Sequence, residues 1–95
     1  PSGTPFALHP ARPNPSRGRT AITLAVPLGG RASLAVYDVA GRLIKRLADG
    51  PLPSGEHTFV WDGRDREGHL VAAGVYFCVA EAGGESAARK LVLMK

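Results

Sequence analysis

The segment TAITLAV, residues 20–26, decides the fold class of this 95-residue chain. Ile22, Leu24 and Val26 occupy every second position, and Thr23 and Ala25 fill the positions between them. Successive side chains of a β-strand point to opposite faces, so this alternation predicts a strand with one apolar face. A lone strand cannot bury that face, so we expect it to belong to a larger sheet.

Further short apolar segments follow this one along the chain. They are RASLAVYD (31–38), with Leu34 and Val36 directed inward, RLIKRL (42–47), EHTFVWD (56–62), GVYFCVAEA (74–82) and AARKLVLMK (87–95). Turn residues separate them in LGG (28–30), DVAG (38–41), the loop ADGPLPSG (48–55) and GGE (83–85). No segment shows a sustained helical period. Six or seven short strands at this spacing predict an all-β fold, an antiparallel β-sandwich.

Two of these segments give specific predictions about side chains. In RLIKRL, Leu43 and Leu47 flank a Lys45 that we expect to point outward. In EHTFVWD, the side chains of His57, Phe59 and Trp61 share a face. We expect Phe59 and Trp61 to lie inside the sandwich, with Trp61 mostly buried.

The first 18 residues differ from the rest because they hold five of the eight prolines. Proline has no N–H to donate to a sheet, so residues 1–18 are predicted to form an extended arm or an edge strand. Within the arm, FALH (6–9) is expected to pair briefly as a strand. Residues 19–95 then form the sandwich. Because the chain starts at Pro1 with no signal peptide, we expect a processed product or a cut fragment.

Composition excludes several classes of function. The chain is 44% hydrophobic and 21% charged, which is typical of one globular domain. Its net charge of +4 comes from scattered cations without interleaved aromatic residues, so we expect a solvated surface and no nucleic-acid partner. No segment approaches the roughly 20 apolar residues that would span a membrane. Cys78, the one cysteine, lies in an apolar segment and is expected to be a buried small hydrophobe.

The charged segment WDGRDREGHLVAAGVY, residues 61–76, is the strongest candidate for a chemical site. Asp62, Asp65 and Glu67 could bind a cation, but arginines lie between them and the spacing differs from that of a calcium loop. DREG (65–68) instead repeats the D-x-x-G spacing of DVAG (38–41), which favours a turn in which Asp bonds the backbone two residues on. We therefore predict a structural loop without a metal. No serine lies in a G-x-S-x-G motif, and the three histidines are too scattered to form a zinc site, so no catalytic residue is predicted.

The order of several short motifs resembles a known family. PNP (13–15), VYDVAGRLIKRL (36–47), SGEHTFVWDGRDREG (54–68), GVYF (74–77) and RKLVLMK (89–95) follow one another in the chain. Together they resemble the Ig-like domain first described in flagellar hook-capping proteins and the related C-terminal sorting domains of bacterial type IX secretion. The resemblance covers residues 8–95.

This resemblance implies an Ig-like β-sandwich of about seven strands, without enzymatic activity or a cofactor, in an extracellular or cell-surface bacterial protein. It also assigns roles to residues. The fold-defining residues would be Tyr37, Asp38, Gly41, Trp61, Asp62, Gly63, Asp65, Gly68, Gly74 and Tyr76. The final strand of the sorting relatives corresponds to Lys90, Leu91, Val92, Leu93, Met94 and Lys95. Many relatives have Phe after PNP where this chain has Ser16, which argues against an aromatic plug that docks the arm on its own domain.

Two functions remain open from the sequence. In the first, the chain is a structural module that polymerises into a fibre, because copies donate their arms to one another's sheet edges. The arm residues for this role are Phe6, Leu8, Pro10, Pro13 and Pro15, and Phe6 and Leu8 would point to the same side. In the second, the chain is a secretion, sorting and surface-attachment domain whose partners are the secretion or attachment machinery. An arm that folds back on its own domain would make the module monomeric.

Overall fold

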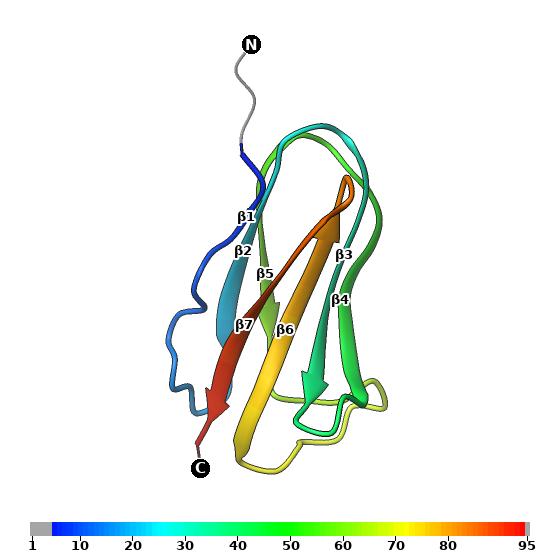
Figure 1. Ribbon diagram of the computed structural model, residues 1–95. Coiled ribbons are helices and arrows are strands. Elements are labelled where there is room, and N and C mark those ends of the chain that lie inside the picture. The colour runs from blue at the N-terminus through cyan, green and yellow to red at the C-terminus, as the bar shows by residue number, and fades with distance from the viewer. Residues whose placement is uncertain (1–4, 95) are drawn as a thin grey trace.

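The computed structural model describes residues 5–94, and within them every regular element is a β-strand (Figure 1). A three-stranded sheet has the order β1 (Ala7–Leu8), β2 (Thr20–Val26) and β5 (Gly55–Trp61). A four-stranded sheet has the order β4 (Leu43–Leu52), β3 (Gly30–Asp38), β6 (Gly74–Ala82) and β7 (Glu85–Leu93). All neighbouring strands pair antiparallel. The predicted all-β sandwich of about seven strands is confirmed. No helix of the described chain is long and apolar enough to cross a membrane.

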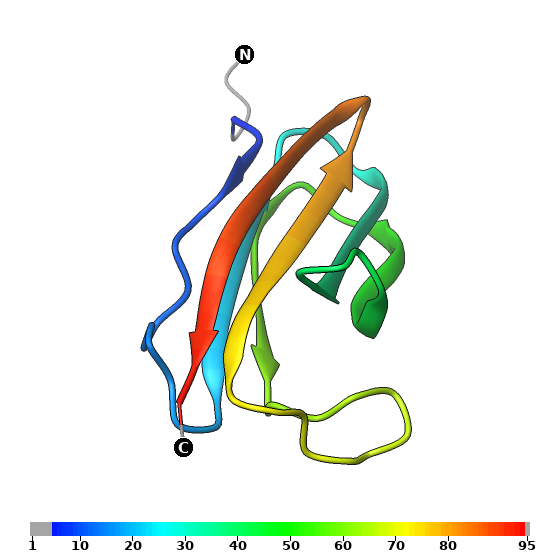
Figure 2. The ribbon, with the colours of Figure 1, turned by 60° about the horizontal axis from the view of Figure 1, so that its bottom comes forward.

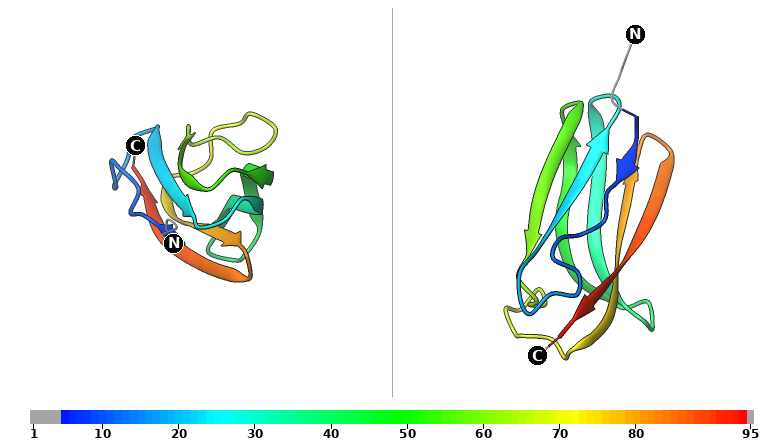
Figure 3. Two further views of the ribbon diagram at one scale, coloured as in Figure 1. Left: turned by 90° about the horizontal axis from the view of Figure 1, so that it is seen from above. Right: turned by 90° about the vertical axis from the view of Figure 1, so that its left-hand side faces the viewer.

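The core lies between the two sheets, which face each other in the view from above in Figure 3. The three-stranded sheet contributes Ile22 and Leu24, and the four-stranded sheet contributes Leu34 and Val36, all of them fully buried. These are the inward positions that the alternation predicts. Cys78 is also fully buried in the core cluster, as expected. Burial raises the pKa of its thiol, which keeps the thiol protonated and unreactive.

Strand β4 differs from the sequence expectation in length and in the direction of its side chains. Its pairing with β3 skips a residue twice, so Ile44 and Leu47 are the extra residues of two bulges. Ile44 and Leu47 pack against the core, whereas Leu43 does not, and Lys45 is half-buried. The expectation that Lys45 points outward between Leu43 and Leu47 is therefore wrong, because Lys45 lies opposite the buried Val36. Simple alternation fails here because each bulge reverses the faces of the residues that follow.

The predicted loop ADGPLPSG (48–55) is also mostly strand. β4 continues through Gly50 and Pro51 to Leu52, and β5 begins at Gly55. Pro51 is tolerated because β4 is the edge strand of its sheet, where a missing N–H leaves no ladder bond unmade. The proline-rich and glycine-rich composition was thus a signal of an edge and not of a loop.

The side chains of β5 lie as predicted. Trp61 is 1% exposed, and Phe59 is half-buried against the core cluster. His57 lies on the same face and is also half-buried, with its Nε2 atom 2.7 Å from the carbonyl oxygen of Pro53.

The N-terminal arm closes one side of the sandwich. Figure 2 shows the chain before β2 running beside both β2 and β7. Ala7 and Leu8 pair with Ala25 and Leu24 of β2, so the brief strand expected in FALH is present. On the opposite side, β4 and β5 are the edge strands of their sheets, and no segment of the described chain covers that side as the arm does here.

Candidate functional site

The arm and the last strand form the most elaborate contact outside the core, and we call this contact the seam. It consists of residues 6–16 and the facing residues 89–94. The arm first extends the three-stranded sheet. The N–H of His9 donates to the carbonyl of Thr23, and Arg12 and Ala21 exchange two backbone bonds of 3.0 and 2.7 Å. The side chain of Leu8 is 3% exposed and belongs to the core cluster, and Phe6 packs against that cluster. Phe6 and Leu8 therefore point to the same side, as predicted.

Beyond Arg12 the arm crosses to the other sheet, where Asn14 clamps β7. The Nδ2 atom of Asn14 donates to the carbonyl of Lys90 at 2.9 Å, and its Oδ1 atom accepts the N–H of Val92 at 2.9 Å. A carboxamide carries one donor and one acceptor side by side, as a peptide group does. Asn14 therefore substitutes for a residue of a neighbouring strand at this edge.

Ser16 adds two backbone hydrogen bonds to the seam. Its N–H donates to the carbonyl of Val92 at 2.9 Å, and its carbonyl accepts the N–H of Met94 at 2.7 Å, which makes a parallel bridge to Leu93. The hydroxyl of Ser16 donates to the carbonyl of Arg19 and accepts the N–H of Gly18, which shapes the turn into β2. Ser16 is 4% exposed. The arm thus docks on its own domain through these hydrogen bonds.

Two further bonds fix the seam from its ends. The Nε atom of Arg89 donates to the carbonyl of Leu8 at 2.7 Å and links β7 to β1. The hydroxyl of Thr20 donates to the carbonyl of Pro13 at 2.7 Å, where the arm changes sheets. Pro10, Pro13 and Pro15 themselves are exposed, so these arm prolines lie on the outside of the strap.

The residues of the final strand alternate between core and surface. Leu91 is 2% exposed and Leu93 is 8% exposed, and both belong to the core cluster. Lys90 is exposed and Val92 half-buried on the outer face, and Met94 is 42% exposed. Lys95 lies outside the described residues.

The two D-x-x-G turns have the same hydrogen bonds, as their spacing predicts. In the first, the Oδ1 atom of Asp38 accepts the N–H groups of Ala40 and Arg42, each at 2.9 Å, and its carbonyl accepts the N–H of Gly41. The backbone N–H of Arg42 is the main cause that lowers the pKa of Asp38 below its ordinary value. The Nε atom of Arg42 also donates to Oδ2 at 2.9 Å.

In the second turn, Oδ1 of Asp65 accepts the N–H groups of Glu67 and His69, and its carbonyl accepts that of Gly68. The N–H of His69 is the main cause that lowers the pKa of Asp65. Gly41 and Gly68 have φ angles of 84° and 87°, a left-handed conformation that side chains disfavour. The prediction of turn chemistry in both motifs is confirmed.

Two aromatic residues, Trp61 and Tyr76, hold the loop that contains the second turn. The Nε1 atom of Trp61 donates to the carbonyl of Arg64 at 2.9 Å, and its ring meets Tyr76 edge-on at a centroid distance of 5.4 Å. The hydroxyl of Tyr76 donates to the carbonyl of Ala72 at 2.6 Å, and burial raises its pKa. These bonds hold both ends of loop 62–73. The N–H of Arg66 ties its middle to β4 by donating to the carbonyl of the bulged Ile44.

The same loop approaches the seam where Gly63 lies beside Leu93 and Gly18. A side chain at this position would meet the carbonyl oxygen of Gly18 at 3.4 Å, and the φ angle of 77° is also one that favours glycine. A cleft of about 560 Å³ lies at this junction, lined by Arg17, Gly18, Asp62, Gly63, Leu70, Val71, Ala72, Ala73, Leu93 and Met94. The remaining motif residues lie nearby. The Oδ1 atom of Asp62 accepts the N–H of Arg64, Tyr37 is half-buried on β3, and Gly74 begins β6.

Three residues of the loop that was weighed as a metal site lie close together. One potential ligand atom from each of Asp65, Glu67 and His69 falls within 4.8 Å of the others, and this is the one such group of three among residues 5–94. Asp65 already accepts two backbone N–H groups through Oδ1. The side chains of Glu67 and His69 are exposed, and Oε1 of Glu67 lies 3.8 Å from Nδ1 of His69. The turn explains the proximity, because it draws residues i, i+2 and i+4 together. The absence of a bound metal stays a prediction.

The chain can now be compared with known proteins. The sequence profile of the FlgD Ig-like domain matches residues 14–86. This chain belongs to the FlgD Ig-like domain family. The basal-body rod modification protein FlgD of Salmonella typhimurium is 33% identical over 63 residues, which cover 59% of this chain and 27% of that protein. The chain therefore spans about a quarter of the length of this relative.

Solved structures include relatives from two bacterial systems. FlgD of Xanthomonas campestris, a protein of hook capping in flagellar assembly, has a TM-score of 0.63 at 25% identity over 95% of this chain and 66% of its own. PorU of Porphyromonas gingivalis, in its dimeric latent form, has a TM-score of 0.63 at 19% identity over 99% of this chain and 10% of its own. PorZ, a surface component of type IX secretion in the same organism, has a TM-score of 0.62 at 23% identity over 94% of this chain and 12% of its own. PorU and PorZ show the shared fold alone.

The FlgD Ig-like match covers only part of the seam. It begins at Asn14 and ends at Ser86, so it includes the clamp residue and both D-x-x-G turns. Phe6 and Leu8 of the arm and the final strand from Lys90 onward lie outside it. Sequence reasoning missed Asn14 and Ser16 as contact residues because their partners lie more than 70 residues away in the chain. Asn14 carried one available signal, since it is a polar residue between two prolines of the arm.

Proposed function

We propose that this chain is a non-enzymatic Ig-like module that serves assembly or attachment of a bacterial protein outside the cell. The observation that supports it most is membership in the FlgD Ig-like domain family. Relatives of the fold include a flagellar hook-capping protein and a surface component of a secretion system. Asp38 and Asp65 also accept backbone N–H groups of their own turns, which supports a structural role for both side chains.

The first form of this function is secretion and surface attachment through the machinery that recognises the final strand. The outward residues Lys90, Val92 and Met94 are the ones that a receptor could contact without opening the core. A reporter protein fused ahead of the chain, in a bacterium with type IX secretion, should reach the cell surface. Replacing Lys90 and Met94 with Ser should reduce surface delivery, and the matched control is replacement of the exposed Val60 and Leu28 with Ser. A reporter that is retained inside the cell with the intact chain would contradict this form.

The second form is polymerisation by donation of the arm. Support for it comes from the construction of the seam, whose bonds belong to residues 6–16 and would be the same with the arm of a neighbour. The short link 17–19 between Ser16 and β2 would act as the hinge. Docking within one chain avoids the entropy cost of association, so donation requires a high concentration or a strained hinge.

Deletion of residues 1–12 separates these forms. The arm then lacks Phe6 and Leu8, and a polymer that depends on donation should disappear in sedimentation velocity and electron microscopy. A synthetic peptide of residues 1–16 should bind the truncated chain, which can be measured by calorimetry. Full-length chain that stays monomeric at millimolar concentration, or truncated chain that still polymerises, would rule out donation and leave the attachment role standing.

A further inference from the structure

Two stretches of the chain that contain no acidic residue meet at the seam. Residues 5–37 and residues 86–94 include arginines and a lysine but no aspartate or glutamate. The hydrogen bonds between the arm and β7 bring the first stretch against the second. Cations that are scattered along the sequence are therefore gathered in space on one side of the sandwich.

Four of these cations lie on the two sides of the arm, and we call them the basic stripe. Arg12 and Arg19 lie on the side of β2, because Arg12 pairs with Ala21 and Arg19 directly precedes the strand. Arg89 and Lys90 belong to β7, on the other side of the arm. The right-hand view of Figure 3 looks onto this part of the molecule, with the arm between β2 and β7.

The charge of the basic stripe is not neutralised by neighbouring acids. Among residues 5–94, no carboxylate makes an ion pair with Arg12, Arg19 or Lys90, and all three residues are exposed. Asp62 lines the cleft beside the link, but its carboxylate lies 4.0 Å from Arg64. The three cations can therefore bind an anion without first breaking an ion pair.

Arg89 adds a guanidinium whose position is fixed. Its Nε atom donates to the carbonyl of Leu8 at 2.7 Å, which holds the side chain between β7 and the arm. A guanidinium carries five N–H donors, and this bond uses one of them. Because arginine forms paired hydrogen bonds with carboxylate, sulfate and phosphate groups, Arg89 is suited to bind an oxyanion at the seam.

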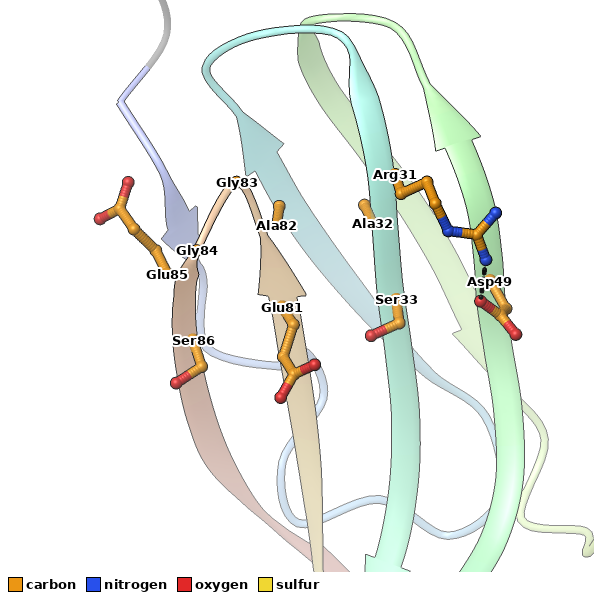
Figure 4. Close-up of a pocket in the computed structure, with 10 residues that line it drawn as sticks. All are labelled: Arg31, Ala32, Ser33, Asp49, Glu81, Ala82, Gly83, Gly84, Glu85 and Ser86. Atoms are coloured by element: carbon orange, nitrogen blue, oxygen red, sulfur yellow. Dashed lines mark hydrogen bonds and ion pairs between the residues drawn. The ribbon is translucent and has the colours of Figure 1, made fainter.

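Acids of the four-stranded sheet gather at the far end of the molecule (Figure 4). Asp49, Glu81 and Glu85 line a cleft of about 510 Å³, where Arg31 donates to Asp49 at 3.3 Å. Glu85 begins β7 four residues before Arg89, which is roughly 13 Å along the strand. A long anion on the basic stripe would therefore extend away from this acidic end, toward the end of β7.

We propose that the basic stripe binds a linear anionic polysaccharide that lies along the arm. The stripe residues line neither of the two clefts named above, which favours a polymer over a small anion. The strand from Arg89 to Met94 spans roughly 17 Å, so a ligand that follows the seam has room for several charged groups. Its carboxylate, sulfate or phosphate groups would meet cations on both sides of the arm.

Two other anionic polymers fit this surface less well. A single-stranded nucleic acid stacks its bases on exposed aromatic rings, but the one aromatic residue of the seam, Phe6, packs against the core. An acidic peptide that adds as a strand needs an open sheet edge, but here the arm already pairs with β2 and bonds β7. A polysaccharide needs neither feature, because its charged groups alone can hold it.

Calorimetric titration of the purified full chain with heparin, a sulfated polysaccharide used as the probe, tests the proposal. Affinity should fall as salt increases, because binding releases counterions from the polymer. Replacing Arg12 and Lys90 together with Ser should weaken binding about tenfold and lower the number of released ions by about two. Neither side chain bonds another residue in the described chain, and thermal unfolding verifies that the variant folds.

The matched control removes the same charge from the side of β4. Arg46 is an exposed residue of β4, and Arg66 is an exposed residue whose N–H bonds the carbonyl of Ile44 in that strand. Replacing Arg46 and Arg66 together with Ser should change the affinity by less than about twofold, because this pair lies away from the stripe.

Three results would overturn the proposal. The first is no binding of heparin at about 50 mM salt. The second is an equal loss of affinity in the two double variants, which would show that net charge alone attracts the polymer. The third is tighter binding of single-stranded DNA or polyglutamate than of heparin, which would assign another class of ligand. The proposal does not rest on either form of the function proposed above, because binding is measured on the purified chain.

Discussion

Asp38 and Asp65 each hold a tight turn closed by accepting two backbone N–H groups on one oxygen. The ionised carboxylate accepts these bonds better than the protonated acid does, which is why both pKa values are lowered. A group with a lowered pKa in the folded state stabilises the fold above the pKa of the unfolded chain. That contribution is lost as the pH falls from the ordinary value of 3.8 through the lower folded value.

We expect Asp38→Asn and Asp65→Asn to reduce the dependence of stability on acid. The melting temperature of the wild-type chain should fall between neutral pH and about pH 2.5, and each variant should show a smaller fall. Circular dichroism at the two pH values measures it. Glu56→Gln is the control, because the carboxylate of Glu56 faces His9 at 3.5 Å on the surface and closes no turn. A variant whose melting temperature falls as far as that of the wild type would contradict the assignment.

Trp61 should be the most costly single truncation in the chain. It is 1% exposed, meets Tyr76 edge-on and bonds the carbonyl of Arg64, so its removal empties the core and frees one end of loop 62–73. Trp61→Ala should lower the free energy of unfolding by about 3–5 kcal/mol, measured by urea denaturation. Val60→Ala, at the exposed neighbouring position, should cost well under half as much. A loss below about 1 kcal/mol for Trp61→Ala would mean that the ring does not support the core.

Among the elements, the arm depends on Asn14 for its attachment to β7. Asn14→Ala removes the bonds to Lys90 and Val92 and should cost about 1–2 kcal/mol in the free energy of unfolding. Hydrogen exchange at the amides of Val92 and Met94 should speed up, whereas that of Ile22 in β2 should not. Asn14→Asp keeps an acceptor for Val92 and should protect that amide better than alanine does. Equal exchange in all three chains would show that the clamp is not formed in solution.

Loop 62–69 is expected to bind neither calcium nor zinc. Asp65 is committed to its own turn through Oδ1, and Arg64 and Arg66 add positive charge beside Glu67 and His69. Calorimetric titration with each metal should give no heat beyond dilution. Because Asp65, Glu67 and His69 lie close together, the titration could detect a metal at this loop. Micromolar binding that disappears in Glu67→Gln would prove the loop to be a metal site.

The elements also show what the sequence can and cannot predict. β2, β3 and β6 were predictable because one face of each meets the core and imposes a period of two. β4 was not, because its bulges at Ile44 and Leu47 reverse the faces and its edge position admits Pro51. The twin turns were predictable because their bonds are local. The clamp at Asn14 was not, because a side chain's partner across a sheet depends on the whole topology.

At the scale of the whole molecule, the arm links the two sheets to each other. It pairs with β2 at Leu8 and Arg12 and bonds β7 at Asn14 and Ser16, so the sheets cannot separate without breaking one of these two sets of bonds. We expect a single cooperative transition in scanning calorimetry, with equal calorimetric and van't Hoff enthalpies. Two transitions, or a pre-transition lost on deleting residues 1–12, would show that the arm melts by itself.

The direction of the seam has a mechanical consequence. The arm and β7 run the same way, and the described chain enters at one end of a body about 45 Å long and leaves at the other (Figure 1). A pull on the two ends therefore draws the arm and β7 in opposite directions along their length. The bonds of Asn14 and Ser16 lie across that direction and are loaded together in shear, instead of opening one after another as in a peeled hairpin. Resistance to force is governed by the rate of unfolding. The seam would therefore let a marginally stable domain carry tension applied at its two ends.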